Sequence, residues 1–148
     1  MKQVSCIGDI CTIDTEYLKG RNPEILLQIL KEKGIDLVID IRDSPAYPIY
    51  YRPASFKALC ATEGIEYQYI KKLGNPKSNR TKYANNPEKQ RAEYLRMLQD
   101  EPERSEALQQ LREQLEAKSE GVCLVCMCDA QDEMGCHRFW LKKLIESS

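Results

Sequence analysis

The run Ile35 to Ile41 (IDLVIDI) constrains the fold more than any other part of the sequence. It is almost continuously apolar, which is typical of a parallel strand that helices cover on both faces. Further strands are expected at Gln3–Ile7, Ile65–Ile70 and Val122–Cys128, with helical patterns between them. The sequence therefore predicts an α/β fold, a three-layer α/β/α domain with a mostly parallel sheet of about four or five strands.

Proline and glycine mark several helix ends. Asn22-Pro23-Glu24 predicts a helix start and Gly34 its end, and Asn86-Pro87-Glu88 repeats the start signal for a helix to about Leu98. The other expected helices are Ser55–Gly64, Glu103–Lys118 and Cys136 to about Glu146. Two connections, Arg42–Ala54 and Lys71–Asn85, are expected to be long loops, and loops of such length are commonly functional.

Length and charge limit the class of protein. A chain of 148 residues suits one domain, residues 1–148. The net charge of −1 gives no whole-molecule attraction to nucleic acid or to an anionic membrane, so any such role must be local. No apolar stretch approaches the length of a membrane span and no leader pattern opens the chain, so we expect a cytoplasmic protein that does not act at a membrane.

The cysteines indicate reduced thiols. There are seven, an odd number, and three of them lie in the predicted strand at 122–128, which does not resemble an extracellular disulfide framework. Cys6, Cys60 and Cys123 are expected in the core.

Polar residues follow each predicted strand, and the carboxyl ends of parallel strands form the ligand crevice of an open sheet. The candidate ligand-binding residues at this edge are Gly8, Asp9, Arg42, Cys128, Cys136 and Arg138. Arg42 either holds a planar oxyanion bidentately or forms an internal salt bridge to Asp9, Asp43 or Asp129. The Cys136-His137-Arg138 start of the last helix suits a phosphate or carboxylate, or else Cys136 is an inert buried thiol.

Two residues are candidates for catalysis. Cys126 and His137 could carry covalent chemistry or proton transfer, because a thiolate needs a nearby base and His137 is the single histidine. Cys126, Cys128, Cys136 and His137 also suggest a structural zinc site as an alternative, although they lack C-x2-C spacing. We therefore predict no cofactor and assign no metal ligand, and leave open whether the protein is an enzyme.

The connection after the third strand is the one basic segment of the chain. Lys77, Arg80 and Lys82, with neighbouring tyrosines, suggest a nucleic-acid-binding module as another alternative. Tyr67 and Tyr69 could equally occupy one face of the third strand. The predicted partner is thus a small anionic ligand or a nucleic acid, and the oligomeric state is not readable from the sequence.

The residues resemble a known family over nearly the whole chain. The opening strand ends in Ile7-Gly8, V-I-D-I-R at 38–42 is followed by Ser44-Pro45, and F-x2-L-x4-G-I-x-Y runs from Phe56 to Tyr67. Leu73-Gly74, Tyr83-Ala84 and a closing L-V-C…C-H-R from Leu124 to Arg138 complete the pattern. The chain is similar to the domain of unknown function 488 (DUF488) family of small α/β proteins.

The resemblance implies an architecture and a site. It implies a parallel sheet flanked by helices, with Arg42, Cys126, Cys136, His137 and Arg138 at one edge. Some relatives are labelled as DNA-repair glycosylases or lyases, which adds a DNA-repair role to the nucleic-acid alternative. Here Asp9 and Ile10 replace a usual His-Ser after Gly8, and Cys128 replaces a common glutamate. Our leading hypothesis is a DUF488-like protein that binds a phosphate-bearing or other anionic ligand at the carboxyl edge of the sheet.

Overall fold

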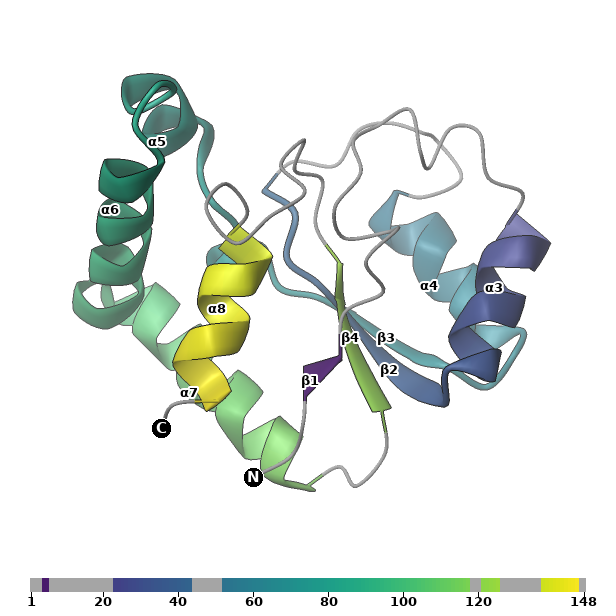
Figure 1. The fold of residues 1–148 in the computed structure, drawn as a ribbon. Coiled ribbons are helices and arrows are strands. Elements are labelled where there is room, and N and C mark those ends of the chain that lie inside the picture. The colour runs from purple at the N-terminus through teal and green to yellow at the C-terminus, as the bar shows by residue number, and fades with distance from the viewer. Residues whose placement is uncertain (1–3, 6–22, 44–51, 118–120, 126–136, 147–148) are drawn as a thin grey trace.

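A parallel β-sheet forms the centre of the protein. The computed structural model describes residues 4–5, 23–43, 52–117, 121–125 and 137–146 (Figure 1). The strands are β1 (Val4–Ser5), β2 (Ile35–Asp40), β3 (Glu66–Tyr69) and β4 (Gly121–Val125), in the order β1-β4-β2-β3 and all parallel. The predicted α/β class and parallel sheet are confirmed.

Helices cover both faces of this sheet. Those on one face are α3 (Pro23–Glu32) and α4 (Pro53–Ala61), and those on the other are α6 (Pro87–Asp100), α7 (Pro102–Ala117) and α8 (His137–Glu146) (Figure 1). The short η2 (Lys71–Leu73) and α5 (Lys77–Lys82) follow β3. None of the described helices combines the length and the apolar composition that a membrane span requires.

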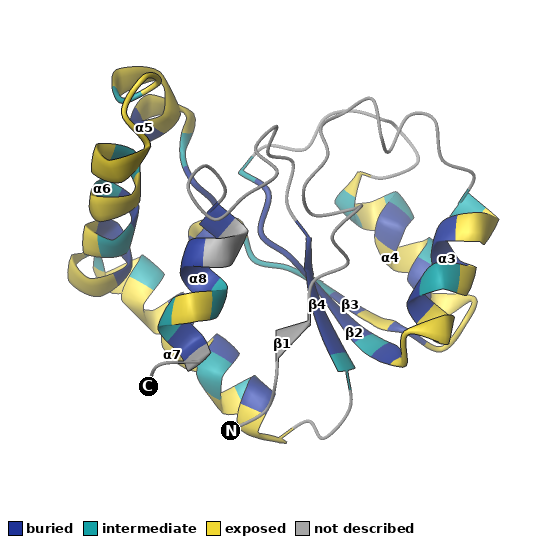
Figure 2. Ribbon diagram, in the orientation of Figure 1, coloured by how far each residue is buried: buried dark blue, intermediate teal, exposed yellow. Residues whose placement is uncertain are grey.

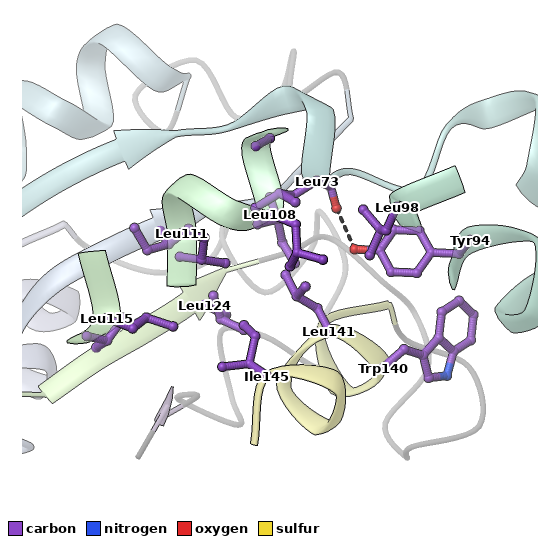
Figure 3. Packing of buried hydrophobic residues seen from close by; sticks show 14 of the residues in the cluster. Leu73, Tyr94, Leu98, Leu108, Leu111, Leu115, Leu124, Trp140, Leu141 and Ile145 are labelled. Atoms are coloured by element: carbon purple, nitrogen blue, oxygen red, sulfur yellow. Dashed lines mark hydrogen bonds between the residues drawn. The ribbon is translucent and has the colours of Figure 1, made fainter. Parts of the chain in front are cut away.

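The two faces of the sheet have separate hydrophobic cores. Figure 2 shows buried positions in the central strands and on the helices of both sides. Leu37 and Ile39 of β2 face the cluster under α6, α7 and α8, whereas Val38 faces the cluster under α3 and α4. This alternation explains why the β2 sequence is apolar on both faces. In the first cluster the buried Tyr94 donates its hydroxyl to the Leu73 carbonyl at 2.7 Å (Figure 3).

Local sequence signals set the helix ends. α3, α4, α6 and α7 each begin at a proline, which lacks the N–H that a first helical turn leaves unused. The Asn86 side chain caps α6 by accepting from the Lys89 N–H at 3.1 Å. Gly34 and Gly64 have φ of +72° and +70°, which confirms that glycine ends both helices in the left-handed conformation.

The prediction of a long loop over Lys71–Asn85 is wrong. This connection contains η2 and α5. The α5 sequence, KSNRTK, has no apolar stripe, so its pattern gave no helical signal. Tertiary hydrogen bonds hold it instead, because the buried Asn79 donates to Asn75 Oδ1 at 2.8 Å and to the Gln90 carbonyl at 3.0 Å.

Candidate functional site

The carboxyl end of β2 carries a buried ion pair between Asp40 and Arg42. Arg42 donates from Nε to Asp40 Oδ1 at 2.8 Å and from Nη2 to Oδ2 at 2.6 Å; the Arg42 side chain is 2% exposed and the Asp40 side chain 0%. Tyr67 of β3 donates its hydroxyl to Oδ2 as well. The Nε–Nη2 edge of the Arg42 fork, which would grip a planar anion, is therefore engaged within the protein.

The surroundings of this ion pair keep Arg42 and Tyr67 in one protonation state each. Burial opposes the charge of the guanidinium, but the hydrogen bonds and charge of Asp40 outweigh it, so the pKa of Arg42 is raised above its ordinary value. Burial, together with the charge of Asp40, also raises the pKa of Tyr67. The Arg42 guanidinium lies 5.8 Å from the centre of the Phe56 ring, on the face that α4 covers. Arg42 stays charged and Tyr67 stays protonated at neutral pH.

Asp43, directly after Arg42, is the meeting point of side chains from β3, η2 and α5. Tyr69 donates its hydroxyl to the Asp43 carbonyl at 2.9 Å, and Lys71 donates Nζ to the same carbonyl. The Asp43 carboxylate lies 3.7 Å from Lys71 Nζ through Oδ1 and 3.6 Å from Arg80 Nη2 through Oδ2. Two cations thus share one carboxylate, and the group of three carries a surplus positive charge.

A close main-chain approach holds this cluster together. A Cβ atom on Gly74 would lie 2.9 Å from the Asp43 Cα and 3.0 Å from its backbone nitrogen. Distances this short force the backbone to move, so only glycine lets the segment after η2 pack directly on Asp43. Arg104 of α7 also donates Nη1 to the Lys72 and Gly74 carbonyls, at 2.7 and 2.9 Å.

His137 brings the start of α8 to the same edge. Its Nε2 lies 2.9 Å from the Ile41 carbonyl oxygen, and the side chain is buried beside Tyr94, with ring centres 5.5 Å apart. A carbonyl only accepts hydrogen bonds, so Nε2 carries the proton. His137 lies on the face that α6 and α8 cover, whereas Arg42 packs on the α4 face. The two predicted site residues meet at the main chain of Ile41 and Arg42, with their side chains on opposite faces.

The described cysteines belong to the core. Cys60 and Cys123 are buried in the cluster under α3 and α4, as expected, and neither is disulfide-bonded. Burial, with smaller contributions from Cys123 and Asp40, raises the pKa of Cys60 to about 12, so its thiol is unreactive at neutral pH. Among the side chains that the structure describes, no group of three or more histidine, cysteine, aspartate or glutamate residues could hold a metal.

Comparison of the chain with models of known protein families gives a match. The family model described as "Domain of unknown function DUF488" matches residues 22–145.

The chain belongs to the DUF488 family. The resemblance inferred from the sequence is thereby confirmed, and the matched range contains β2, the Asp43 cluster and the start of α8. No curated protein and no solved structure matches the chain.

Several predicted site residues of this DUF488 protein lie outside the described ranges. They are Gly8, Asp9, Cys126, Cys128 and Cys136. Arg138 is the second residue of α8, and its side chain is outside the description. The ligand, catalytic and zinc roles assigned to these residues stay predictions.

The predicted nucleic-acid residues lie on or near α5. Lys77 and Lys82 are exposed, and Lys82 Nζ lies 5.3 Å from the centre of the Tyr83 ring. Arg80 instead approaches Asp43. Tyr67 and Tyr69 use their hydroxyls within the protein, which agrees with the alternative that they occupy one face of β3.

Sequence reasoning did not name Asp40 as a partner of Arg42, and it named Asp43 only as a possible partner of Arg42. Among the described residues, Arg42 forms its ion pair with Asp40 rather than with Asp43, and the other expected partners, Asp9 and Asp129, lie outside the described ranges. The spacing of two residues was the available signal, because alternate residues of an extended segment share a face. No comparable signal exists for Asp43, whose partners come from distant parts of the sequence.

Proposed function

We propose that this DUF488 protein binds a phosphate-bearing or other anionic ligand at the carboxyl edge of its sheet. The observation that carries the proposal is the contact of His137 Nε2 with the Ile41 carbonyl, which lies beside the end of β2. The N–H groups and dipole of a helix N-terminus favour an anion. The first turn of α8 also contains Arg138 and no acidic residue.

The charges around the edge support the same ligand class. Asp40 neutralises Arg42, so we assign Arg42 to holding the edge in shape rather than to gripping the ligand. Lys71 and Arg80 both lie within 4 Å of the Asp43 carboxylate, which brings two positive charges and one negative charge together at this edge. We assign ligand attraction to these two residues and to Arg138. We assign His137 to holding the start of α8 at this edge, because Nε2 donates to the Ile41 carbonyl, and its role in proton transfer stays a prediction.

The experiment is isothermal titration of the whole chain with inorganic phosphate and with a phosphate monoester of a small sugar. Arg138→Gln should weaken binding about tenfold or more, as loss of a charged hydrogen bond does. Lys143→Gln is the matched control, because it removes a positive charge from the last turn of the same helix. Equal effects of the two variants, or no effect of Arg138→Gln, would contradict the proposal.

Arg42→Ala is unsuitable for this test. It leaves the buried Asp40 carboxylate without its counterion, so a loss of binding would report a loss of folding.

A nucleic-acid-binding module is the second candidate function, favoured by the exposure of Lys77 and Lys82 on α5. Phosphate contacts release counterions, so binding of a single-stranded oligonucleotide should fall steeply with salt. It should weaken in the Lys77→Met/Lys82→Met double variant. An oligonucleotide affinity that changes neither with salt nor with these substitutions would exclude this candidate.

A further inference from the structure

We propose that the Asp43 carboxylate is a built-in counterion for an oxyanion site formed by Lys71 and Arg80, and that the oxyanion of a ligand replaces it there. This inference rests on the proposed function and gives it a ligand class, a carboxylate or phosphate group with at least two acceptor oxygens. It also gives Asp43 a role that opposes binding.

The arrangement of the three side chains resembles that of a bound oxyanion. Lys71 Nζ faces Asp43 Oδ1 at 3.7 Å, and Arg80 Nη2 faces Oδ2 at 3.6 Å. Each cation therefore addresses a different oxygen of the same carboxylate. Both distances exceed the 2.7–2.9 Å of a charge-assisted hydrogen bond, so the carboxylate compensates the cations without binding them tightly.

Contacts other than the carboxylate fix the positions of the two cations. Lys71 Nζ donates to the Asp43 backbone carbonyl. Arg80 Nε donates to the Asn75 carbonyl at 3.1 Å. The buried Asn75 is itself held, since its Nδ2 donates to Gln90 Oε1 at 2.8 Å. Loss of the Asp43 charge therefore leaves both cations in place.

The site is accessible to a ligand. The Lys71 and Arg80 side chains are 56% and 49% exposed, whereas Asp43 is 17% exposed. An oxyanion can thus approach the cations from solvent while the Asp43 main chain stays bound to Tyr69 and packed on Gly74. Repulsion between the carboxylate and the ligand then lowers affinity, and removing the Asp43 charge raises it.

The test is titration of the whole chain with inorganic phosphate, for the wild type and a set of variants. Asp43→Asn keeps the shape of the side chain and should bind phosphate about fivefold more tightly, the effect of one unit charge roughly 5 Å away in water. Arg80→Met should weaken binding by a similar factor. Lys33→Met is the matched control, because Lys33 is exposed and precedes β2, at the opposite end of the strand from Asp43; it should change affinity less than about twofold at physiological salt, since distant exposed charges are screened.

The outcomes separate this inference from the proposed function. Tighter binding by Asp43→Asn that disappears when Lys71→Met is added supports the inference. If the wild type binds phosphate and Arg138→Gln weakens it, while Asp43→Asn binds equally or less well, the inference is overturned and the proposed function stands. If neither the wild type nor Asp43→Asn binds phosphate, both fail. Circular dichroism and thermal unfolding of Asp43→Asn establish that its main-chain contacts persist.

Discussion

Replacing Arg42 with methionine should destabilise the protein strongly. Methionine keeps much of the volume of the arginine stem but removes the guanidinium that donates from Nε and Nη2 to Asp40. The carboxylate then retains the Arg42 backbone N–H at 3.1 Å and the Tyr67 hydroxyl as donors. A buried charge without its counterion results.

The size of the effect follows from the burial of the pair. Breaking a buried ion pair by removing one partner costs about 3–5 kcal/mol. The total free energy of unfolding of a typical domain is only about 5–15 kcal/mol, so Arg42→Met should lower it by a large fraction. Replacing Asp40 by leucine and Tyr67 by phenylalanine in the same variant removes the stranded polar groups. This triple variant should recover most of the lost stability.

Urea denaturation of the single and triple variants, followed by circular dichroism, measures both effects. Arg96→Met is the control, because Arg96 forms ion pairs with Glu93, Asp100 and Glu101 at the surface. Exposed pairs contribute little, so this variant should unfold close to the wild type although it loses three ion pairs. If Arg96→Met cost as much as Arg42→Met, or if the triple variant were the least stable, the reasoning from burial would be refuted.

Three further predictions concern stability, each measured by chemical denaturation. Gly121→Ala should cost about 1–3 kcal/mol, because its Cβ would lie 2.6 Å from the Gly34 carbonyl oxygen; an unchanged midpoint would contradict this contact. Asn86→Ala should lower the free energy of unfolding by about 1 kcal/mol because it removes the α6 cap, whereas Asn86→Ser, which can still cap the helix, should keep most of that stability. Alkaline pH should destabilise the protein, because the pKa of Cys60 rises from 9.0 to about 12 on folding, so the unfolded chain loses this proton first. The contribution of the protonated Cys60 thiol to the free energy of unfolding is fully present below about pH 9 and is lost as the pH rises towards 12, by roughly 4 kcal/mol in all. The free energy of unfolding of Cys60→Ala should therefore fall less steeply with pH over this range.

Regular elements with strong local signals could be predicted from the sequence. The apolar run at 35–41 became β2, and the Asn-Pro-Glu signals at 22–24 and 86–88 lie at the starts of α3 and α6. Gly34 and Gly64 end helices because their left-handed φ suits glycine. These features depend on neighbours along the chain, so hydrophobic period and cap chemistry are enough to find them.

The candidate site depends on long-range contacts and was less predictable. Arg42 was identified, but its partner depends on the strand alternation that places Asp40 on the same face. The Asp43 cluster requires η2 and α5 to fold back on the end of β2, with Gly74 in close contact. No local pattern specifies that packing. α5 itself was missed because hydrogen bonds of Asn79, rather than an apolar stripe, hold it in place.

The most direct test of oxyanion binding at the carboxyl edge is an NMR titration of the ¹⁵N-labelled whole chain with inorganic phosphate. The account predicts saturable shifts of the backbone amides at Asp43, Arg80 and the first turn of α8, with the amides of α3 as an internal reference that does not move. Saturable shifts confined to other surfaces, or no shift at phosphate concentrations in the tens of millimolar, would contradict it.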